Sequence, residues 1–183
     1  MSYEQYPKFI AFCTAQRKFE GGGGGVNNPA NLRCPDGQMQ SWNRLAQGSV
    51  DNFCMFPTPQ IGVQAHQNEI YSICIGNSPT YNEGAIALGL KDSSELTIGQ
   101  MISIYAPVKD NNDPVHYAQI LCQLANLNVT DTMKSLLDTS PSPIIQKPIL
   151  QVPPVTLNSP LVHPSVQEDW WVKLWQWLAS LAS

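Results

Sequence analysis

A single glutamate, Glu20, stands where an apolar-rich segment of the chain meets a glycine-rich stretch. The surrounding sequence, QRKFEGGGGGVNNPANLRC (residues 16–34), places five glycines and three asparagines after it. At the C-terminal end of a helix, the helix dipole and partial burial both disfavour an ionised carboxylate. A carboxyl group that keeps its proton near neutral pH can protonate a leaving oxygen as a general acid. The alternative interpretation is an exposed glutamate at a fraying helix end.

The residues before Glu20 have the pattern of a helix over residues 7–20. Pro7 suits the first turn and Gly21 suits the position after the last residue. At 3.6 residues per turn, Glu20 shares a face with Phe9 and Cys13. The pattern therefore predicts a partly buried carboxyl group at the end of this helix.

Three further helices and one short strand are predicted to complete the domain. Thr58, Thr97 and Pro114 are typical of helix starts, as cap or first-turn residues. The expected helices span residues 58–75, 97–106 and 112–127, a short segment at 129–138 closes the domain, and residues 52–56 favour a strand. No regular element is predicted in residues 76–95. The expected fold class is mainly α, with one small sheet or hairpin within residues 30–56.

The composition excludes several classes of function. Of the 183 residues, 43% are apolar and only 13% are charged, which indicates a folded core rather than a disordered chain. The net charge is −4, and the ten lysines and arginines form no cluster. We therefore do not expect nucleic acid as a partner. The N-terminus does not resemble a secretory signal.

The cysteines and histidines do not follow a metal-binding pattern. Five cysteines occur at positions 13, 34, 54, 74 and 122, without a Cys-x-x-Cys pair. We expect them to be buried thiols in a chain made in a reducing cytosol. His66, His116 and His163 are far apart. The sequence predicts neither a metal site nor a cofactor.

The C-terminal part of the chain differs in composition. Residues 139–167 hold seven of the 15 prolines and are expected to form an extended linker or arm. Residues 168–183 are expected to form an amphipathic helix, and they hold four of the five tryptophans. Such a helix suits docking onto the domain, onto another protein or onto a membrane surface, with protein favoured because Lys173 is its only positive charge.

Four motifs follow one another in order between residues 8 and 138. They are KFEG with NNPANLR, then FPTPQIGVQA, LTIGQMISIYAPVKDNNDPVHYAQILCQL and VTDTMKSLL. Together they resemble a family of phage and prophage virion-associated structural proteins with a lysozyme-like domain. The resemblance implies an α+β lysozyme-like fold for residues 1–138, similar to lytic transglycosylases and goose-type lysozymes.

The resemblance also implies roles for individual residues. In lytic transglycosylases and goose-type lysozymes a glutamate ends an early helix at the floor of a glycan groove, and a later tyrosine lies close to it. Carried over, Glu20 is the catalytic acid and base, and Tyr105, Tyr117, Asn28 and Asn31 are candidate substrate-binding residues. From the residues alone, most of the asparagines are expected to cap turns, and one of them to line the groove. Arg33 is a candidate ion-pair partner for a buried carboxylate such as Glu20.

The implied activity is cleavage of the glycosidic bond between N-acetylmuramic acid and N-acetylglucosamine in peptidoglycan. A hydrolase with two carboxylates needs a second one across the groove, and only Asp36 and Asp51 are candidates. A lytic transglycosylase is therefore favoured over a muramidase. The resemblance places the protein in a virion, or in the cytosol of an infected cell with delivery to the cell wall. The alternative is an inactive structural or attachment virion protein, anchored through its C-terminal helix.

Overall fold

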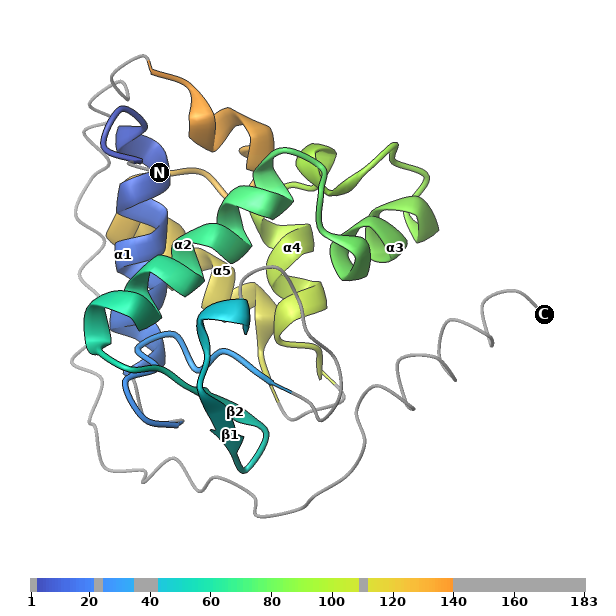
Figure 1. Cartoon of the computed structure of the whole chain (residues 1–183). Coiled ribbons are helices and arrows are strands. Elements are labelled where there is room, and N and C mark those ends of the chain that lie inside the picture. Colours follow the sequence, from blue (N-terminus) through green and yellow to red (C-terminus); the bar gives the residue numbers. More distant parts are fainter. Residues whose placement is uncertain (1–2, 22–24, 35–42, 109–111, 140–183) are drawn as a thin grey trace. The chain divides into compact units, whose positions relative to one another are not determined.

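The computed structural model describes residues 3–21, 25–34, 43–108 and 112–139. The chain divides into two units, residues 1–143 and 144–183, and all of the described residues belong to the first. The predicted proline-rich arm beyond residue 139 and the predicted tryptophan-rich helix lie outside the described residues. The described part is mainly helical with one small hairpin, which confirms the expected fold class at this level (Figure 1).

The regular elements follow the chain in a simple order. The helices are α1 (Pro7–Glu20), α2 (Pro59–Cys74), α3 (Pro79–Ala87), α4 (Ile98–Tyr105) and α5 (Pro114–Ala125). The strands β1 (Gly48–Val50) and β2 (Phe53–Met55) form an antiparallel hairpin. Short 3-10 helices span Asn43–Leu45, Ser93–Glu95 and Met133–Leu137.

The predicted helix boundaries are confirmed where local chemistry sets them. The Thr58 side chain accepts a hydrogen bond from the Ile61 amide, and Thr97 forms a full capping box with Gln100. Gly21 ends α1 in the left-handed conformation at φ 67°, where its N–H binds the Arg17 carbonyl. The Gly21 cap makes Glu20 the last residue of α1.

No helix is predicted in residues 76–95, but the structure contains one there. They contain α3 and a 3-10 helix, with Pro79 in the first turn of α3. Only Tyr81 and Ala85 of α3 are buried, so the helix has no broad apolar stripe that the sequence pattern could reveal. Its contribution to the interior is the Tyr81 ring.

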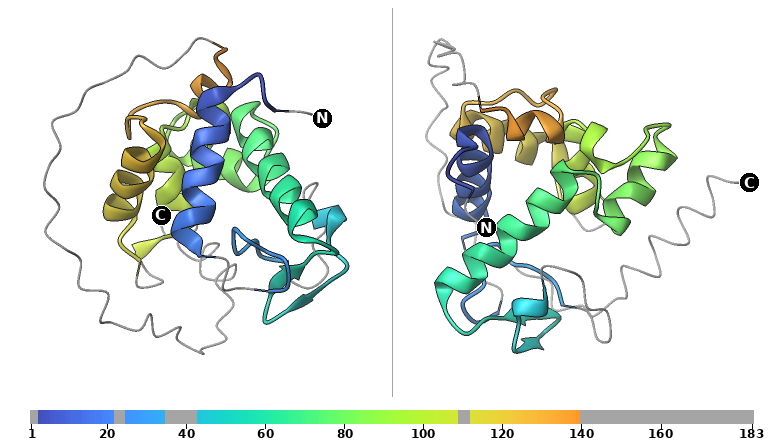
Figure 2. Two further views of the ribbon diagram at one scale, coloured as in Figure 1. Left: turned by 90° about the vertical axis from the view of Figure 1, so that its left-hand side faces the viewer. Right: turned by 45° about the horizontal axis from the view of Figure 1, so that its top comes forward.

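Two apolar clusters stabilise the domain. The larger lies among the helices, where α1 packs along α5 and α4 packs against α5 (Figures 1 and 2). Its fully buried large side chains include Phe9, Phe12, Ile70, Ile73, Met101, Ile102, Leu121 and Met133. Each contributes about 1.5–3 kcal/mol when removed from water. The smaller cluster lies under the hairpin and consists of Ala30, Leu32, Cys54, Phe56 and Ala65.

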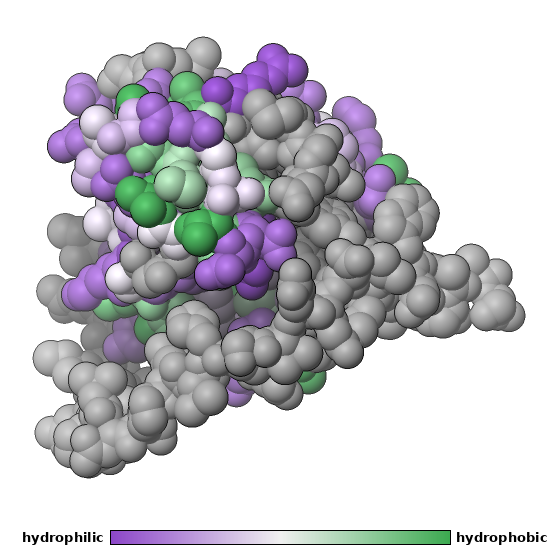
Figure 3. Space-filling model, turned by 60° about the horizontal axis from the view of Figure 1, so that its bottom comes forward, coloured by the Kyte–Doolittle hydropathy of each residue, from purple (hydrophilic) through white to green (hydrophobic). Residues whose placement is uncertain are grey.

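The end of α1 that carries Glu20 points toward the hairpin side of the domain (Figure 1). Figure 3 views the molecule from that side, and small hydrophobic areas on its described surface are bordered by hydrophilic residues. The surface of this side is thus mixed rather than uniformly apolar. Across the described part of the chain, no helix combines the length and hydrophobicity needed to cross a membrane.

Helix α2 lies so close to the asparagine-rich loop (residues 25–34) that only glycine fits at position 62. A Cβ atom there would lie 2.0 Å from the Asn27 carbonyl oxygen and 2.9 Å from Pro29 Cδ. The backbone oxygen cannot move away without shifting the loop. Gly62 therefore sets the distance between α2 and the loop that continues to Asn31.

Replacing Gly62 by alanine tests this close approach. In a helix interior, alanine is about 1 kcal/mol more favourable than glycine. The clash of the alanine side chain with the loop is expected to outweigh this gain and to leave the variant about 1–3 kcal/mol less stable. We expect Gly62→Ala to lower the free energy of unfolding measured in urea. The control is Gly99→Ala in α4, where the nearest atom to a Cβ is at 3.5 Å. If Gly62→Ala is as stable as the native chain, or more stable, α2 and the loop do not approach each other this closely.

Candidate functional site

Both carboxylate oxygens of Glu20 are held by hydrogen bonds. The Tyr117 hydroxyl donates to Oε1 at 2.5 Å, and Asn31 Nδ2 donates to Oε2 at 3.0 Å. Asn31 Nδ2 also donates to the backbone carbonyl of Glu20 at 3.2 Å, an atom that can only accept, so the orientation of the amide is fixed. The partly exposed carboxylate thus joins α1, the asparagine-rich loop and α5.

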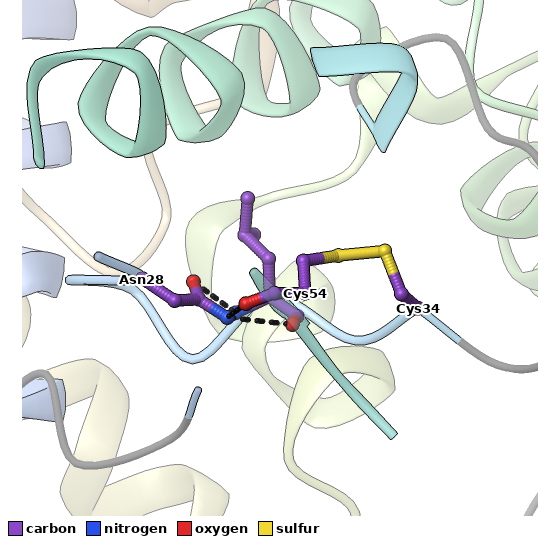
Figure 4. The surroundings of a disulfide bond; sticks show 4 residues. Asn28, Cys34 and Cys54 are labelled. Carbon is purple, nitrogen blue, oxygen red and sulfur yellow. Dashed lines mark hydrogen bonds between the residues drawn. A yellow bond between two sulfur atoms is a disulfide. The ribbon is translucent and has the colours of Figure 1, made fainter. Parts of the chain in front are cut away.

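The loop that carries Asn31 is built around a buried amide. Asn28 Nδ2 donates to the carbonyls of Leu32 and Cys54, and its Oδ1 accepts from the Leu32 amide (Figure 4). Every polar atom of this side chain is therefore used by the backbone. Asn31 itself adopts φ 52°, a conformation that asparagine tolerates better than most residues. Asn28 shapes the loop, and Asn31 contacts the candidate catalytic group.

A disulfide bond joins this loop to the hairpin. Cys34 and Cys54 are bonded, with their Cα atoms 4.9 Å apart (Figure 4). The prediction of five reduced thiols is wrong for this pair, because the hairpin brings together two cysteines that lie 20 residues apart in sequence. Cys13, Cys74 and Cys122 are buried, as predicted. Cys34 lies three residues after Asn31, so the disulfide restrains the loop that positions Asn31.

The two candidate tyrosines meet beside Glu20. The rings of Tyr117 and Phe19 are stacked, with their centroids 4.0 Å apart. The rings of Tyr105 and Tyr117 pack edge to face, with their centroids 6.1 Å apart. The Tyr105 hydroxyl donates to the Ala30 carbonyl at 3.1 Å, which ties α4 to the loop. Burial, and then the neighbouring Glu20, raise the pKa of Tyr117, so its hydroxyl stays protonated and available as a donor.

Sequence reasoning missed three buried polar residues next to this group. Gln16 lies one turn before Glu20 on α1, and His66 and Glu69 lie one turn apart on α2. His66 Nε2 contacts Gln16 Oε1 at 3.0 Å, and His66 Nδ1 contacts Arg17 Nη1 at 3.3 Å. Their helical spacing relative to Glu20 and to the apolar positions of α2 is the sequence signal that could have revealed them.

The ionisable members of this buried group are neutral near pH 7. Burial, and to a lesser extent Arg17, lower the pKa of His66 to about 3. Burial, and then the charge of Glu20, raise the pKa of Glu69 to about 8. Glu69 is only 7% exposed, and its Oε2 has no hydrogen-bond partner among the described residues. A protonated, buried carboxyl group therefore accompanies Glu20.

Asp51 and Arg33 are the other predicted candidates that lie within the described residues. Asp51 is exposed in the hairpin turn, and Asp36 lies outside the described residues. The Arg33 guanidinium sits 4.1 Å above the Phe53 ring. His116 is exposed on α5, and within the described ranges no three His, Cys, Asp or Glu side chains are grouped to hold a metal ion. Among the described residues, Glu69 is a second carboxyl group that interacts electrostatically with Glu20.

No protein family, curated protein or solved structure matches the chain. The chemistry of the site must therefore be argued from its geometry. A partly exposed carboxyl group, oriented by two uncharged donors and set beside a half-exposed aromatic ring, can exchange a proton with a bound ligand.

Removing the disulfide is expected to destabilise the domain. A bond that closes a loop of this length contributes about 3 kcal/mol, mainly by restricting the unfolded chain. We expect the Cys34→Ala, Cys54→Ala double variant to unfold at lower urea concentration, and a reducing agent to do the same to the native chain. The control is the double variant with reducing agent, which should show no further change. Equal stability of the native chain with and without the reducing agent would contradict the role of the bond.

The buried ionisable groups predict how stability depends on pH. Because the pKa of Glu69 is raised in the folded chain, its contribution to the free energy of unfolding is fully present below pH 4.5 and is lost as the pH rises to about 8. The lowered pKa of His66 gives stability that is complete above pH 6.5 and is lost as the pH falls to about 3. The two effects oppose each other between pH 4.5 and 6.5, so stability from these groups is highest there.

We expect Glu69→Gln to remove the loss of stability that the ionisation of Glu69 causes as the pH rises to about 8. That loss has a limiting slope of about 1.4 kcal/mol per pH unit for one proton. The measurement is the free energy of unfolding in urea from pH 5 to 9, compared with Glu83→Gln, which alters an exposed glutamate of α3. An unchanged alkaline slope in Glu69→Gln would show that Glu69 is not the group responsible.

Proposed function

We propose that the protein is a peptidoglycan-cleaving glycosidase in which Glu20 is the catalytic acid and base, and that it cuts between N-acetylmuramic acid and N-acetylglucosamine. The observation that carries the proposal is the pair of hydrogen bonds from Tyr117 and Asn31, which orient a partly exposed carboxyl group at the end of α1. The resemblance of its sequence motifs to phage proteins with a lysozyme-like domain supports the choice of substrate.

In the proposed reaction Glu20 acts twice. Its proton passes to the glycosidic oxygen as the bond between that oxygen and carbon 1 of the muramic acid breaks. The hydroxyl on carbon 6 of the same sugar then attacks carbon 1 and returns its proton to Glu20. The products are a 1,6-anhydro sugar and a free N-acetylglucosamine end. With water as the attacking group, the same residue would produce a reducing end.

Tyr117 and Asn31 suit the intermediate stage of this reaction. Once Glu20 has lost its proton, both of its oxygens carry negative charge, and each already accepts one hydrogen bond. Fixed donors of this kind stabilise a developing charge without the need to reorganise. The carboxylate also keeps its orientation until it takes up the second proton.

Two further features favour a sugar ligand. The Phe19 ring stacks on Tyr117 through one face and remains 40% exposed, so it offers an aromatic surface beside Glu20. The carboxyl group of Glu20 is itself partly exposed, so a sugar hydroxyl or glycosidic oxygen can approach it. The disulfide agrees with a protein that works outside a reducing cytosol, as a virion part acting on the cell wall would.

A second candidate function is supported by the same contacts. The hydrogen bonds of Glu20 tie three segments together, which is also what a purely structural glutamate would do. In this case the domain is an inactive scaffold of a virion, used for structure or attachment. Activity measurements on a variant that keeps the shape of the side chain separate the two functions.

The test is the loss of turbidity of purified cell walls, with the full chain and with Glu20→Gln. Glutamine preserves the size of the side chain but carries no acidic proton. We expect the rate of clearing to fall at least about 100-fold, the usual contribution of a general acid. Glu83→Gln, on the exposed face of α3, is the matched control and should clear at the native rate.

Two results would contradict the enzymatic function. Failure of the native chain to clear walls from several bacterial classes would favour the structural candidate. Equal clearing by the native chain and by Glu20→Gln would remove Glu20 from the reaction. Circular dichroism of both proteins shows whether the variant keeps its fold.

A further inference from the structure

The disulfide between Cys34 and Cys54 lies close in sequence to the loop residue that contacts Glu20. Asn31 Nδ2 donates to Oε2 of Glu20 at 3.0 Å and to its backbone carbonyl at 3.2 Å. Cys34 follows Asn31 by three residues, and its partner Cys54 belongs to β2. A covalent bond therefore joins the loop to the hairpin within a few residues of the candidate catalytic group.

The short segment between Asn31 and the disulfide is paired with the hairpin. The Cys54 amide donates to the Leu32 carbonyl at 2.9 Å, and the Cys34 amide donates to the Asn52 carbonyl at 2.8 Å. Only two residues separate Asn31 from Cys34, and both of these backbone bonds hold that segment. A displacement of Cys34 is therefore carried to Asn31 through a short, hydrogen-bonded piece of chain.

The two cysteines differ in their freedom to move. Cys54 is completely buried in the smaller apolar cluster. A Cβ atom at Gly25 would lie 2.4 Å from the Cys54 carbonyl oxygen, so the start of the loop lies directly against this residue. Cys34 is half-buried at the border of the same cluster. Because protein interiors are close-packed, two separate thiols need more room than the bonded pair, and the movement falls on Cys34.

We propose that the Cys34–Cys54 bond is a redox switch of the Glu20 site: the disulfide form holds Asn31 on Glu20, and the dithiol form releases it. The proposal rests on the proposed function, since the activity that it controls is that of Glu20. Neither cysteine belongs to the larger apolar cluster, so the helical core persists in the dithiol form. The switch acts on the loop rather than on the whole fold.

The bond opens by thiol–disulfide exchange with a dithiol reductant. A thiolate of the reductant attacks the sulfur of Cys34, the less buried partner, and Cys54 leaves as a thiolate that takes up a proton. The second thiol of the reductant then attacks the mixed disulfide, which releases Cys34 as a thiol and closes a cyclic disulfide. Two electrons and two protons pass from the reductant to the protein. A small-molecule disulfide such as oxidised glutathione reverses the reaction.

The switch fits the two environments that the proposed function requires. Thiols are kept reduced in a cytosol, whereas disulfides persist outside it. A chain that cleaves peptidoglycan is thus held in a form of low activity where it is made and becomes active at the cell wall. The cysteines at positions 13, 74 and 122 are buried in the larger cluster and are not part of the switch.

The first test does not depend on activity. It compares NMR spectra of the full chain with and without dithiothreitol. We expect the Nδ2 signals of Asn31, identified by their loss in Asn31→Ala, to shift when the bond is reduced. The methyl signals of Met101 and Met133, both fully buried in the larger cluster, should keep their positions. Unchanged Asn31 signals would overturn the switch, and so would displaced signals of both methionines, because the whole domain would then respond.

The second test compares cleavage of soluble glycan strands by the disulfide and dithiol forms of the native chain. A hydrogen bond to a charged group corresponds to about a ten- to hundredfold change. We expect kcat to be lower by this factor in the dithiol form, with KM within about twofold, because positioning acts on the chemical step. Oxidised glutathione should restore the native kcat. Equal kcat values in the two forms of an active chain would refute the proposal.

Asn31→Ala tests whether the switch acts through Asn31. If it does, kcat of this variant is already low, and reduction lowers it no further. Asn77→Ala, which alters an exposed asparagine between α2 and α3, is the matched control and should respond to reduction like the native chain. A further tenfold fall on reduction of Asn31→Ala would overturn the route through Asn31. Inactivity of both forms of the native chain would overturn only the proposed function, since the NMR comparison still decides the switch.

Discussion

The hydrogen bonds of the Glu20 carboxyl group connect parts of the chain that are far apart in sequence. Through Asn31 it contacts a loop 11 residues away, and through Tyr117 a helix 97 residues away. The geometry of the site therefore depends on correct packing of α1 along α5 and on the contacts of the loop with α1 and α4. Charged side chains are seldom placed at such a junction unless their hydrogen bonds are satisfied, and here both oxygens are.

Several constraints on the loop follow from this dependence. The buried amide of Asn28 shapes it, the disulfide fixes its far end, and Gly62 allows α2 to lie directly against it. Tyr105 adds a bond from α4 to the carbonyl of Ala30. Each of these residues acts at a distance from the carboxylate, yet each limits how far Asn31 can move. The proposed reaction needs this precision because small displacements of a catalytic group cost rate.

The sequence predicted the parts of this arrangement that are set locally. The end of α1 at Glu20, the cap at Thr97 and the mainly helical fold follow from propensity and capping rules that act over a few residues. The sequence also singled out Tyr105, Tyr117 and Asn31, all of which the fold brings close to Glu20.

What the sequence did not predict depends on contacts between distant segments. The bond between Cys34 and Cys54 requires the hairpin, and α3 is too short and too little buried to show a clear period. The helical spacing of Gln16, His66 and Glu69 indicates burial of each, but only the packing of α1 against α2 brings them together as a buried polar group. The second carboxyl group was sought among the aspartates for the same reason.

The central claim is that Glu20 breaks a glycosidic bond, and the products report on this directly. Purified peptidoglycan digested with the full chain can be separated and its fragments identified by mass spectrometry. The account predicts disaccharide peptides that end in 1,6-anhydro-N-acetylmuramic acid, released by the native chain and not by Glu20→Gln. Fragments cut only within the peptides, or the same sugar products from both proteins, would contradict it.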